Sequence, residues 1–278
     1  MGAIADIRDV TLKKQMESLM IRVDKLTSLG VLSAGIAHEI RNPLAGMKAC
    51  CQVLARKITQ GKQQVLIAGI LNEIDRLNTI VTDLVTFSGS TPHYPGPADI
   101  GGILEKTLGL LKDTIKKAGI EVIQPHTGEG PPAFADREQV QQIFLNIILN
   151  AVNAMPDGGK LTISLKTVPE DRLKRKKGKG ESPQAKGSTQ NGLEITFTDT
   201  GSGIKKKDLD LVFNPFFTTS PKGSGLGLSI VHKLVENNKG VIFITSTHGQ
   251  GTRVTLILPA ADPAALRRNM TKPDKRTS

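Results

Sequence analysis

Residues 29–44 read LGVLSAGIAHEIRNPL, and this stretch determines the fold of the first third of the chain. The apolar residues that recur in it at helical spacing are Leu29, Leu32, Ile36 and Ile40. They form one stripe along a helix, and the helical pattern extends over residues 10–58. Pro43 interrupts the pattern, so we expect the helix to be kinked there.

A second helical pattern covers residues 63–87, after a turn that Gly61 marks. The apolar residues on one face of this helix are Leu66, Ile70, Ile74, Leu77, Val81 and Leu84. Two long amphipathic helices joined by a short turn predict a helical hairpin. Because a two-helix unit cannot bury its stripe alone, we expect a second copy to complete a four-helix bundle in a homodimer.

The remaining two thirds of the chain mix helices with strands, so the fold class predicted for the whole chain is α+β. Helices are predicted over 99–118, 136–154 and 226–237, and strands over 120–124, 160–167, 193–199, 240–246 and 252–258. We expect Asp136 to cap its helix, since Gln139 follows three residues later as in a capping box. These elements predict an α/β sandwich with one layer of helices on a mixed sheet.

Composition indicates where the parts of the chain begin and end. We expect a helical lead-in over 1–24, a hairpin unit over 25–89, a linker over 90–98, a sandwich unit over 99–260 and a basic disordered tail over 261–278. Most of the net charge of +11 comes from that tail and from a Lys-rich loop inserted over 168–191. Such Gly-, Pro-, Ser- and Lys-rich segments cannot pack a core, so we interpret them as solvated.

Several classes of protein are excluded by what the sequence lacks. Trp is absent and only one Tyr occurs, which argues against an aromatic surface for nucleic acid. No apolar run reaches the roughly 18 residues that a membrane span needs. Two adjacent cysteines, Cys50 and Cys51, make neither a disulfide framework nor a metal site. We therefore expect a cytoplasmic protein without a membrane span and without a nucleic-acid partner.

His38 is the first candidate for chemistry. At about 100° per residue it falls about 180° from the apolar stripe, so it is expected to project into solvent. Glu39 is adjacent and Asn42 follows one turn later. A neutral imidazole is a good nucleophile near pH 7, and a neighbouring carboxylate can accept its proton. On chemistry alone, a functional histidine and an ordinary surface histidine remain equally open.

The helix predicted over 136–154 carries a stripe of neutral amides. Its members are Gln139, Gln142, Asn146, Asn150 and Asn153. Much of the remaining circumference is apolar, so the helix is expected to be mostly buried. The amides either bond backbone groups inside the protein or line a polar cleft, where an asparagine oxygen could help to hold Mg²⁺.

Two glycine-rich stretches follow. DTGSG at 199–203 ends a strand, and GSGLG at 223–227 opens a helix. Glycine lets the backbone approach a ligand closely, and a helix N-terminus offers free N–H groups to phosphate. An aspartate at a strand end can accept a hydrogen bond from the exocyclic amine of a base. Between the two stretches, NPFFTT at 214–219 is interpreted as a mobile lid.

In this order and spacing, the motifs resemble those of the sensor histidine kinases of two-component systems over about residues 25–258. HEIRNPL at 38–44 resembles their H box, NIILNA at 146–151 the N box, DTGSG the G1 box, FNPFFTT at 213–219 the F box, GSGLGL at 223–228 the G2 box and GQGT at 249–252 the closing motif. The H box with Asn42 is most similar to the nitrogen-regulation subgroup.

The resemblance implies a dimerising phosphotransfer hairpin followed by a catalytic ATP-binding domain of the gyrase type. His38 would accept a phosphoryl group from ATP, with Glu39 as its base, and pass it to an aspartate of a response-regulator receiver domain. Asn42 would support phosphatase activity toward that receiver, and Asn150 would ligate Mg²⁺. The residues implied for nucleotide binding are Asn146, Asn150, Asn153, Asp199, Gly201, Gly203, Thr218, Thr219, Lys222, Gly223, Gly225, Leu226, Gly227 and Thr252. Asp199 would hold the adenine amine, helped by Thr252.

The sequence departs from the family at two positions. Asn153 and Ser220 stand where many relatives carry a basic residue, and Lys222 is the candidate to replace it. No sensory domain precedes the hairpin, so we expect a partner or a longer chain to bring the signal.

Two alternatives stay open at this point. One is an ATPase of the gyrase, mismatch-repair or chaperone kind, which would use a glutamate where Asn146 stands. The other is a non-catalytic dimeric scaffold that binds ATP.

Overall fold

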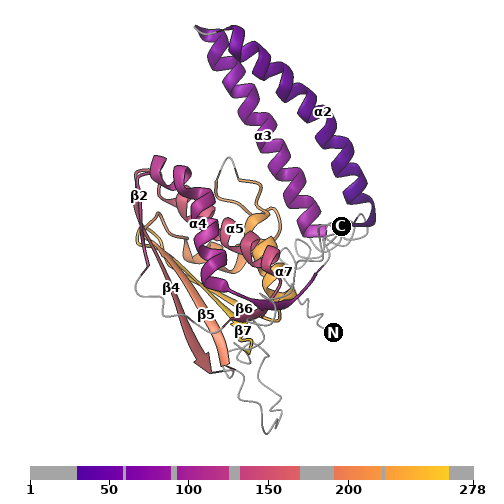
Figure 1. Cartoon of the computed structure of the whole chain (residues 1–278). Helices are drawn as coiled ribbons and strands as arrows, with labels where there is room; N and C mark the ends of the chain where they lie inside the picture. The colour runs from indigo at the N-terminus through magenta and orange to yellow at the C-terminus, as the bar shows by residue number, and fades with distance from the viewer. Residues whose placement is uncertain are drawn as a thin grey trace, which may run out of the picture. The chain divides into compact units, whose positions relative to one another are not determined.

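A computed structural model shows the fold of the chain in two units, Met1–Pro92 and His93–Ser278 (Figure 1). It describes residues 30–58, 61–88, 93–124, 132–169, 191–220 and 223–262, without the side chains of residues 30–39 and 88. The predicted lead-in, Lys222, and nearly all of the predicted insertion and tail lie outside the described residues. None of the helices described is long and apolar enough to cross a membrane.

The first unit is the predicted helical hairpin. Helix α2 (Gly30–Lys57) and helix α3 (Lys62–Ser88) pack side by side, and α2 continues through Pro43 (Figure 1). Between the two helices, Lys48 Nζ lies 2.6 Å from a carboxylate oxygen of Asp75. Apolar residues buried in the hairpin are Leu44, Ile67, Ile74, Val81 and Phe87.

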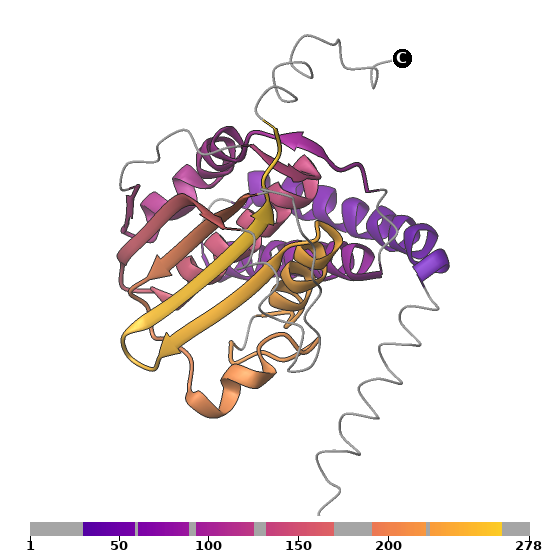
Figure 2. The same ribbon diagram turned by 90° about the horizontal axis from the view of Figure 1, so that it is seen from below.

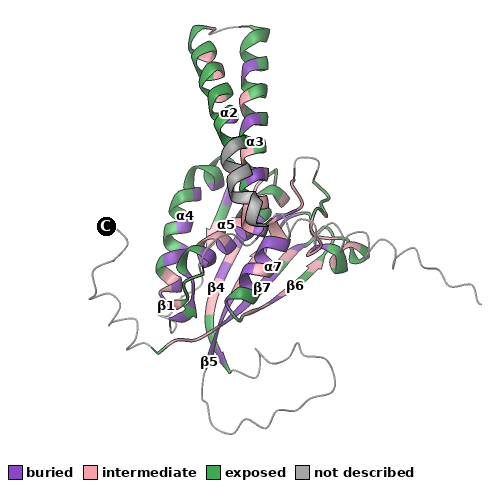
Figure 3. Ribbon diagram, turned by 90° about the vertical axis from the view of Figure 1, so that its right-hand side faces the viewer, coloured by how far each residue is buried: buried purple, intermediate pink, exposed green. Residues whose placement is uncertain are grey.

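The apolar face predicted on α3 is divided between two environments. Ile74 and Val81, together with Ile67, recur every seven residues and are buried. Leu66, Ile70 and Leu77 lie on the other edge of the face and remain 66%, 50% and 42% exposed. Figure 3 shows that exposed residues run along both helices of the hairpin. A single hairpin therefore leaves apolar side chains in water, as the sequence predicted.

The second unit is a five-stranded sheet covered by helices on one face (Figure 1 and Figure 2). In spatial order the strands are β2 (Ile120–Ile123), β4 (Gly159–Pro169), β5 (Asn191–Asp199), β7 (Gly251–Pro259) and β6 (Val241–Thr247). Strand β2 is parallel to β4 and the other pairs are antiparallel, so the sheet is mixed as predicted. The covering helices are α4 (Ile100–Lys117), α5 (Arg137–Ala154) and α7 (Gly227–Asn237). A short 3₁₀ helix, η1 (Lys206–Leu211), was not anticipated.

The core of this unit lies between the sheet and its helices. From Ile195 onward strand β5 alternates, with Ile195 and Phe197 buried and Thr196 and Thr198 less so. The ring of Phe197 meets that of Phe144 on α5 with centroids 5.4 Å apart, which shows that this side of β5 faces the helix. The predicted sandwich and the α+β class are confirmed.

The linker predicted over 90–98 is wrong for its last residues. Gly96–Ala98 forms strand β1, which pairs antiparallel with β3 (Ala133–Ala135) in a separate two-stranded sheet. Proline is tolerated there because both strands of such a sheet are edges, so the missing N–H of Pro97 interrupts no inner ladder. Residues 93–98 therefore belong to the second unit.

Candidate functional site

Helix α5 carries the stripe of amides and begins at a side-chain cap. Oδ1 of Asp136 accepts hydrogen bonds from the backbone N–H groups of Glu138 at 2.9 Å and Gln139 at 3.2 Å, as an N-cap residue does. The reciprocal half of the predicted capping box is not formed. The side chain of Gln139 instead accepts a hydrogen bond from Asn238, and the backbone N–H of Asp136 also bonds to Asn238.

Two of the amides meet the start of helix α7. A methyl group built on Gly227 would lie 3.8 Å from Oδ1 of Asn146 and 3.9 Å from Nδ2 of Asn150. Asn150 is exposed, whereas Nδ2 of Asn146 is buried and has no hydrogen-bond partner among the described residues. A buried donor without a partner is costly, and such groups mark functional sites. Asn153, one turn further along α5, is exposed and open to a ligand.

The N-terminus of α7 offers backbone donors to a ligand. The preceding residue, Leu226, forms no side-chain cap, so first-turn N–H groups of α7 lack an intrahelical partner. Such a terminus favours phosphate. The side chain of Leu226 is buried, so this predicted binding residue can contribute only its backbone.

The predicted lid packs closely against the glycines before α7. Gly225 has φ 69°, and a Cβ there would lie 2.5 Å from the carbonyl carbon of Phe216. A Cβ on Gly223 would lie 2.7 Å from Oγ1 of Thr218, which accepts a hydrogen bond from the N–H of Ser220 at 3.0 Å. At Gly225, where the neighbour is backbone and φ is positive, only glycine permits the approach, whereas at Gly223 the side chain of Thr218 would have to move. Thr219 is exposed at the same loop.

Asp199 ends strand β5 and is held by backbone donors. Its Oδ1 accepts hydrogen bonds from the N–H groups of Gly201 at 2.9 Å and Thr252 at 3.1 Å, so Oδ2 is not required for these bonds. Burial raises the pKa of the Asp199 carboxyl above its ordinary value, against a smaller opposite effect of the hydrogen bonds. Thr252 acts through its N–H, while its hydroxyl lies 3.0 Å from that of Ser246.

The glycines after Asp199 join this strand end to α5. A Cβ on Gly201 would lie 2.6 Å from the carbonyl oxygen of Ala154, and the N–H of Ser202 donates to that oxygen at 3.0 Å. Gly203 has φ 64° and stands against the backbone of Thr247. Because Ala154 ends α5 one turn after Asn150, the N, G1 and G2 motifs gather around the C-terminal half of this helix.

The residues present fit a nucleotide with its metal. Amide oxygens suit Mg²⁺, a fixed carboxylate suits the amine of a base, and a free helix N-terminus suits phosphates. Within the described residues, no group of three His, Cys, Asp or Glu side chains could hold a metal ion alone. A metal here would therefore share its coordination between Asn150 and the phosphates of the ligand.

The residues of the H box lie on the other unit. His38 and Glu39 are in helix α2, and their side chains are outside the described part of the chain, so their pairing stays a prediction. Asn42 is exposed on the same helix.

Comparison with known proteins agrees with this arrangement. The model of the histidine kinase-, DNA gyrase B- and HSP90-like ATPase family matches residues 135–262. The model of the His Kinase A phospho-acceptor domain matches residues 28–91. The signal transduction histidine-protein kinase AtoS of Escherichia coli is 32% identical over 93% of this chain, which spans 39% of the length of AtoS.

Two solved structures share the fold. Full-length ShkA, crystallised with AMPPNP, has a TM-score of 0.62 and 24% identity over 84% of this chain and 47% of that chain. Histidine kinase ThkA, in complex with the response regulator TrrA, has a TM-score of 0.56 and 22% identity over 93% of this chain and 69% of that chain. The two matched domains and the similarity to AtoS show that the chain belongs to the sensor histidine kinases of two-component systems.

Proposed function

We propose that this chain binds ATP with Mg²⁺, phosphorylates itself on His38 and passes the phosphoryl group to an aspartate of a response-regulator receiver domain. One observation carries the proposal. The same chain carries a matched phospho-acceptor domain that includes His38 and a second unit in which Asn146 and Asn150 meet Gly227. The AMPPNP bound to ShkA and the regulator bound to ThkA support the nucleotide and the partner.

Each part of the site has a separate task in this proposal. Asp199 accepts a hydrogen bond from the adenine amine, the N-terminus of α7 binds phosphates, and the amide oxygen of Asn150 ligates Mg²⁺. Asn150 would hold the metal, and Mg²⁺ bound there would supply charge neutralisation at the phosphates. Asn146 donates its Nδ2 hydrogens to the ligand and so gains the partner that it lacks in the protein. We expect Thr218 and Thr219 of the lid to bind the nucleotide, and Lys222, which lies outside the described residues, to neutralise phosphate charge.

The phosphotransfer step requires a nucleophile. A ring nitrogen of His38 attacks the γ-phosphorus, and an N–P bond forms while the bond to the ADP oxygen breaks. Glu39 takes the proton from the other ring nitrogen and leaves the imidazole neutral. Asn42, exposed on the same helix, orients a water molecule for dephosphorylation of the receiver.

Simple ATP hydrolysis is less well supported. ATPases with a related domain use a glutamate at the position of Asn146 to activate water. An amide cannot act as such a base, and the buried Nδ2 of Asn146 is a donor. A non-catalytic scaffold would have no need of the phospho-acceptor domain that matches residues 28–91.

The exposed edge of the hairpin supports a homodimer. Leu66, Ile70 and Leu77 on α3 and Met47 on α2 leave apolar area in water, and a second hairpin would bury it in a four-helix bundle. In domain terms, we propose a dimerisation and phosphotransfer domain over 25–89. The catalytic domain would begin at His93 rather than at residue 99. A cytoplasmic location stays a prediction.

Incubation with γ-labelled ATP tests the proposal. The wild type should acquire acid-labile, base-stable label, and His38→Ala should acquire none while it binds ATP with nearly unchanged affinity. His126→Ala is the matched control, because His126 lies in neither matched domain. Label that survives in His38→Ala would show that another residue accepts the phosphoryl group.

A further inference from the structure

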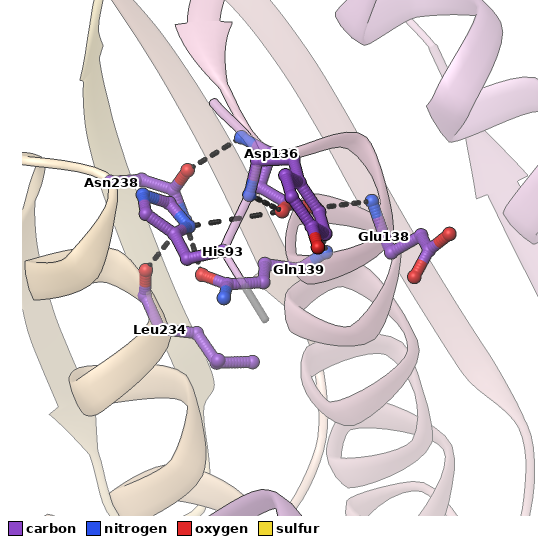
Figure 4. A network of polar contacts seen from close by, with 7 residues as sticks. His93, Asp136, Glu138, Gln139, Leu234 and Asn238 are labelled. Carbon is purple, nitrogen blue, oxygen red and sulfur yellow. Dashed lines mark hydrogen bonds and ion pairs between the residues drawn. The ribbon is translucent and has the colours of Figure 1, made fainter. Parts of the chain in front are cut away.

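The ends of α5 and α7 that lie away from the glycine-rich motifs are joined by a buried polar network (Figure 4). Asn238 is the C-cap residue that follows α7, is 2% exposed and is the central residue of this network. Its Oδ1 accepts a hydrogen bond from the N–H of Asp136 at 2.7 Å. Its Nδ2 donates to Oε1 of Gln139 at 3.0 Å and to the carbonyl of Leu234 at 2.7 Å. Both polar atoms of the Asn238 amide, Oδ1 and Nδ2, therefore bond to the start of α5 and join the end of α7 to it.

Asp136 extends the network to the first residues of the second unit. While Oδ1 caps α5, Oδ2 accepts a hydrogen bond from the N–H of Tyr94 at 2.7 Å and lies 3.8 Å from Nδ1 of His93. Figure 4 shows His93, Asp136 and Asn238 gathered at this point. One carboxylate thus holds both the helix start and the chain that enters the unit.

The two helices are antiparallel and are in contact at two separated places. The network joins Gln139 to Asn238 at one place, and Gly227 lies against Asn150 at the other. At about 1.5 Å per residue, the spans from Gln139 to Asn150 and from Gly227 to Asn238 are each about 16 Å. The equal spans keep the contact at Asn150 in register with the network.

The hydrogen bonds of Asn238 specify the position of α7 along α5 more closely than apolar packing does. Apolar contacts between helices are non-directional, so by themselves they specify the position along the axes less closely than directed bonds do. Hydrogen bonds fix distance and angle. Two bonds from one buried amide, to Asp136 and Gln139 at the start of α5, therefore fix the position of α7 along α5, and the third bond, to Leu234 of α7 itself, holds the amide in place.

We propose that Asn238 is a positioning residue for the phosphate end of the nucleotide site. It fixes the axial register of α7 against α5 and so sets where Gly227 and the N-terminus of α7 stand relative to Asn150. The inference rests on the proposed function, because it takes these groups to bind phosphates and Mg²⁺. Asp199, which would hold adenine, lies on β5, so a change of register should affect the phosphate end of the site alone.

The test compares two ligands on the full chain. Affinities for AMPPNP with Mg²⁺ and for adenosine, which carries no phosphate, are measured by calorimetry. Asn238→Ala should weaken AMPPNP binding about tenfold, the equivalent of about one lost hydrogen bond or ligand contact, and change adenosine binding less than about twofold. Asn237→Ala is the matched control on an exposed neighbour and should change neither affinity.

A milder variant guards against a folding defect. Gln139→Met removes one bond and leaves the other two of Asn238, so it should cause a smaller loss of the same selectivity. The double variant should be no worse than Asn238→Ala, since both changes break the same contact. Melting curves without nucleotide show whether each variant is folded. If Asn238→Ala does not fold, the proposal is judged on Gln139→Met instead. A selective loss of AMPPNP affinity in that variant supports the proposal, and equal losses for both ligands overturn it.

The outcomes separate two failures. Equal losses for both ligands, or no loss for either, would overturn the positioning role. A wild type that binds neither ligand would instead overturn the proposed function, on which this inference depends.

Discussion

Gly225 and Gly227 stand two residues apart, yet the same substitution should change stability in opposite directions at the two positions. Gly225 has φ 69°, and a Cβ there would lie 2.5 Å from the carbonyl carbon and 2.7 Å from the carbonyl oxygen of Phe216. Gly227 begins α7 without a positive φ, and its added Cβ would meet nothing closer than 3.8 Å.

The two costs follow from these geometries. For Gly225→Ala, the left-handed backbone costs about 1–2 kcal/mol and the overlap with Phe216 about 1–3 kcal/mol, so the free energy of unfolding should fall by about 2–5 kcal/mol. For Gly227→Ala, the lower entropy of the unfolded chain should raise it by about 0.5–1 kcal/mol. At about 2–4 °C per kcal/mol, Tm should fall by about 4–20 °C in the first variant and rise by about 1–4 °C in the second.

Differential scanning calorimetry of the unliganded full chain measures both effects. The transition of the second unit is identified in the wild type as the one that AMPPNP with Mg²⁺ raises. A Gly225→Ala variant whose Tm stays within about 1 °C of the wild type would refute the close approach of Phe216. A large fall in both variants would refute the distinction between the two glycines.

Two further variants test the charge and the apolar surface described above. Burial raises the pKa of the Asp199 carboxyl from its ordinary value of 3.8, so the ionised carboxylate lowers the free energy of unfolding at pH values above the pKa of the folded state. This loss of stability disappears once the pH falls below the pKa of the unfolded state. Asp199→Asn keeps an oxygen for the N–H groups of Gly201 and Thr252, so the unliganded variant should be at least as stable as the wild type at pH 7, with a smaller difference at pH 4. Urea unfolding at both pH values checks this, and a variant that is less stable only at pH 7 would contradict it. Leu77→Glu should weaken the dimerisation affinity measured by sedimentation at least about tenfold, because two buried charges would face apolar side chains. Asn72→Glu, at an exposed position, is the control and should leave this affinity unchanged. An intact dimer in Leu77→Glu would place the interface elsewhere.

Local patterns in the sequence were sufficient to predict most of the elements. The helix predicted over 136–154 is Arg137–Ala154, and Asp136 caps it as its side chain and position indicate. The strand predicted over 193–199 is Asn191–Asp199. In each case the period of apolar residues and a terminal polar residue lie within one short window, so no distant contact was needed to recognise them.

Features that depend on distant partners could not be predicted. Strand β1 has the composition of a linker, and it becomes a strand only because Ala133–Ala135 pairs with it. Asn238 lies in the turn-like sequence ENNKG, and its partners Asp136 and Gln139 precede it by about a hundred residues. From the sequence alone, Gln139 is assigned to a capping box with Asp136, because its actual partner, Asn238, lies too far along the chain to be recognised.

The β4–β5 hairpin has a consequence for engineering. Pro169 and Asn191 stand opposite each other in the ladder, so the two chain ends that lead into the Lys-rich segment are already neighbours. Lengthening a loop whose ends are fixed costs only about 0.6 kcal/mol for each doubling of its length. The tip of this hairpin is thus a place to insert a fluorescent reporter domain while the strand register around Asp199 is preserved. A chain labelled in this way could be followed optically without a change to the glycine-rich motifs at 199–203 and 223–227.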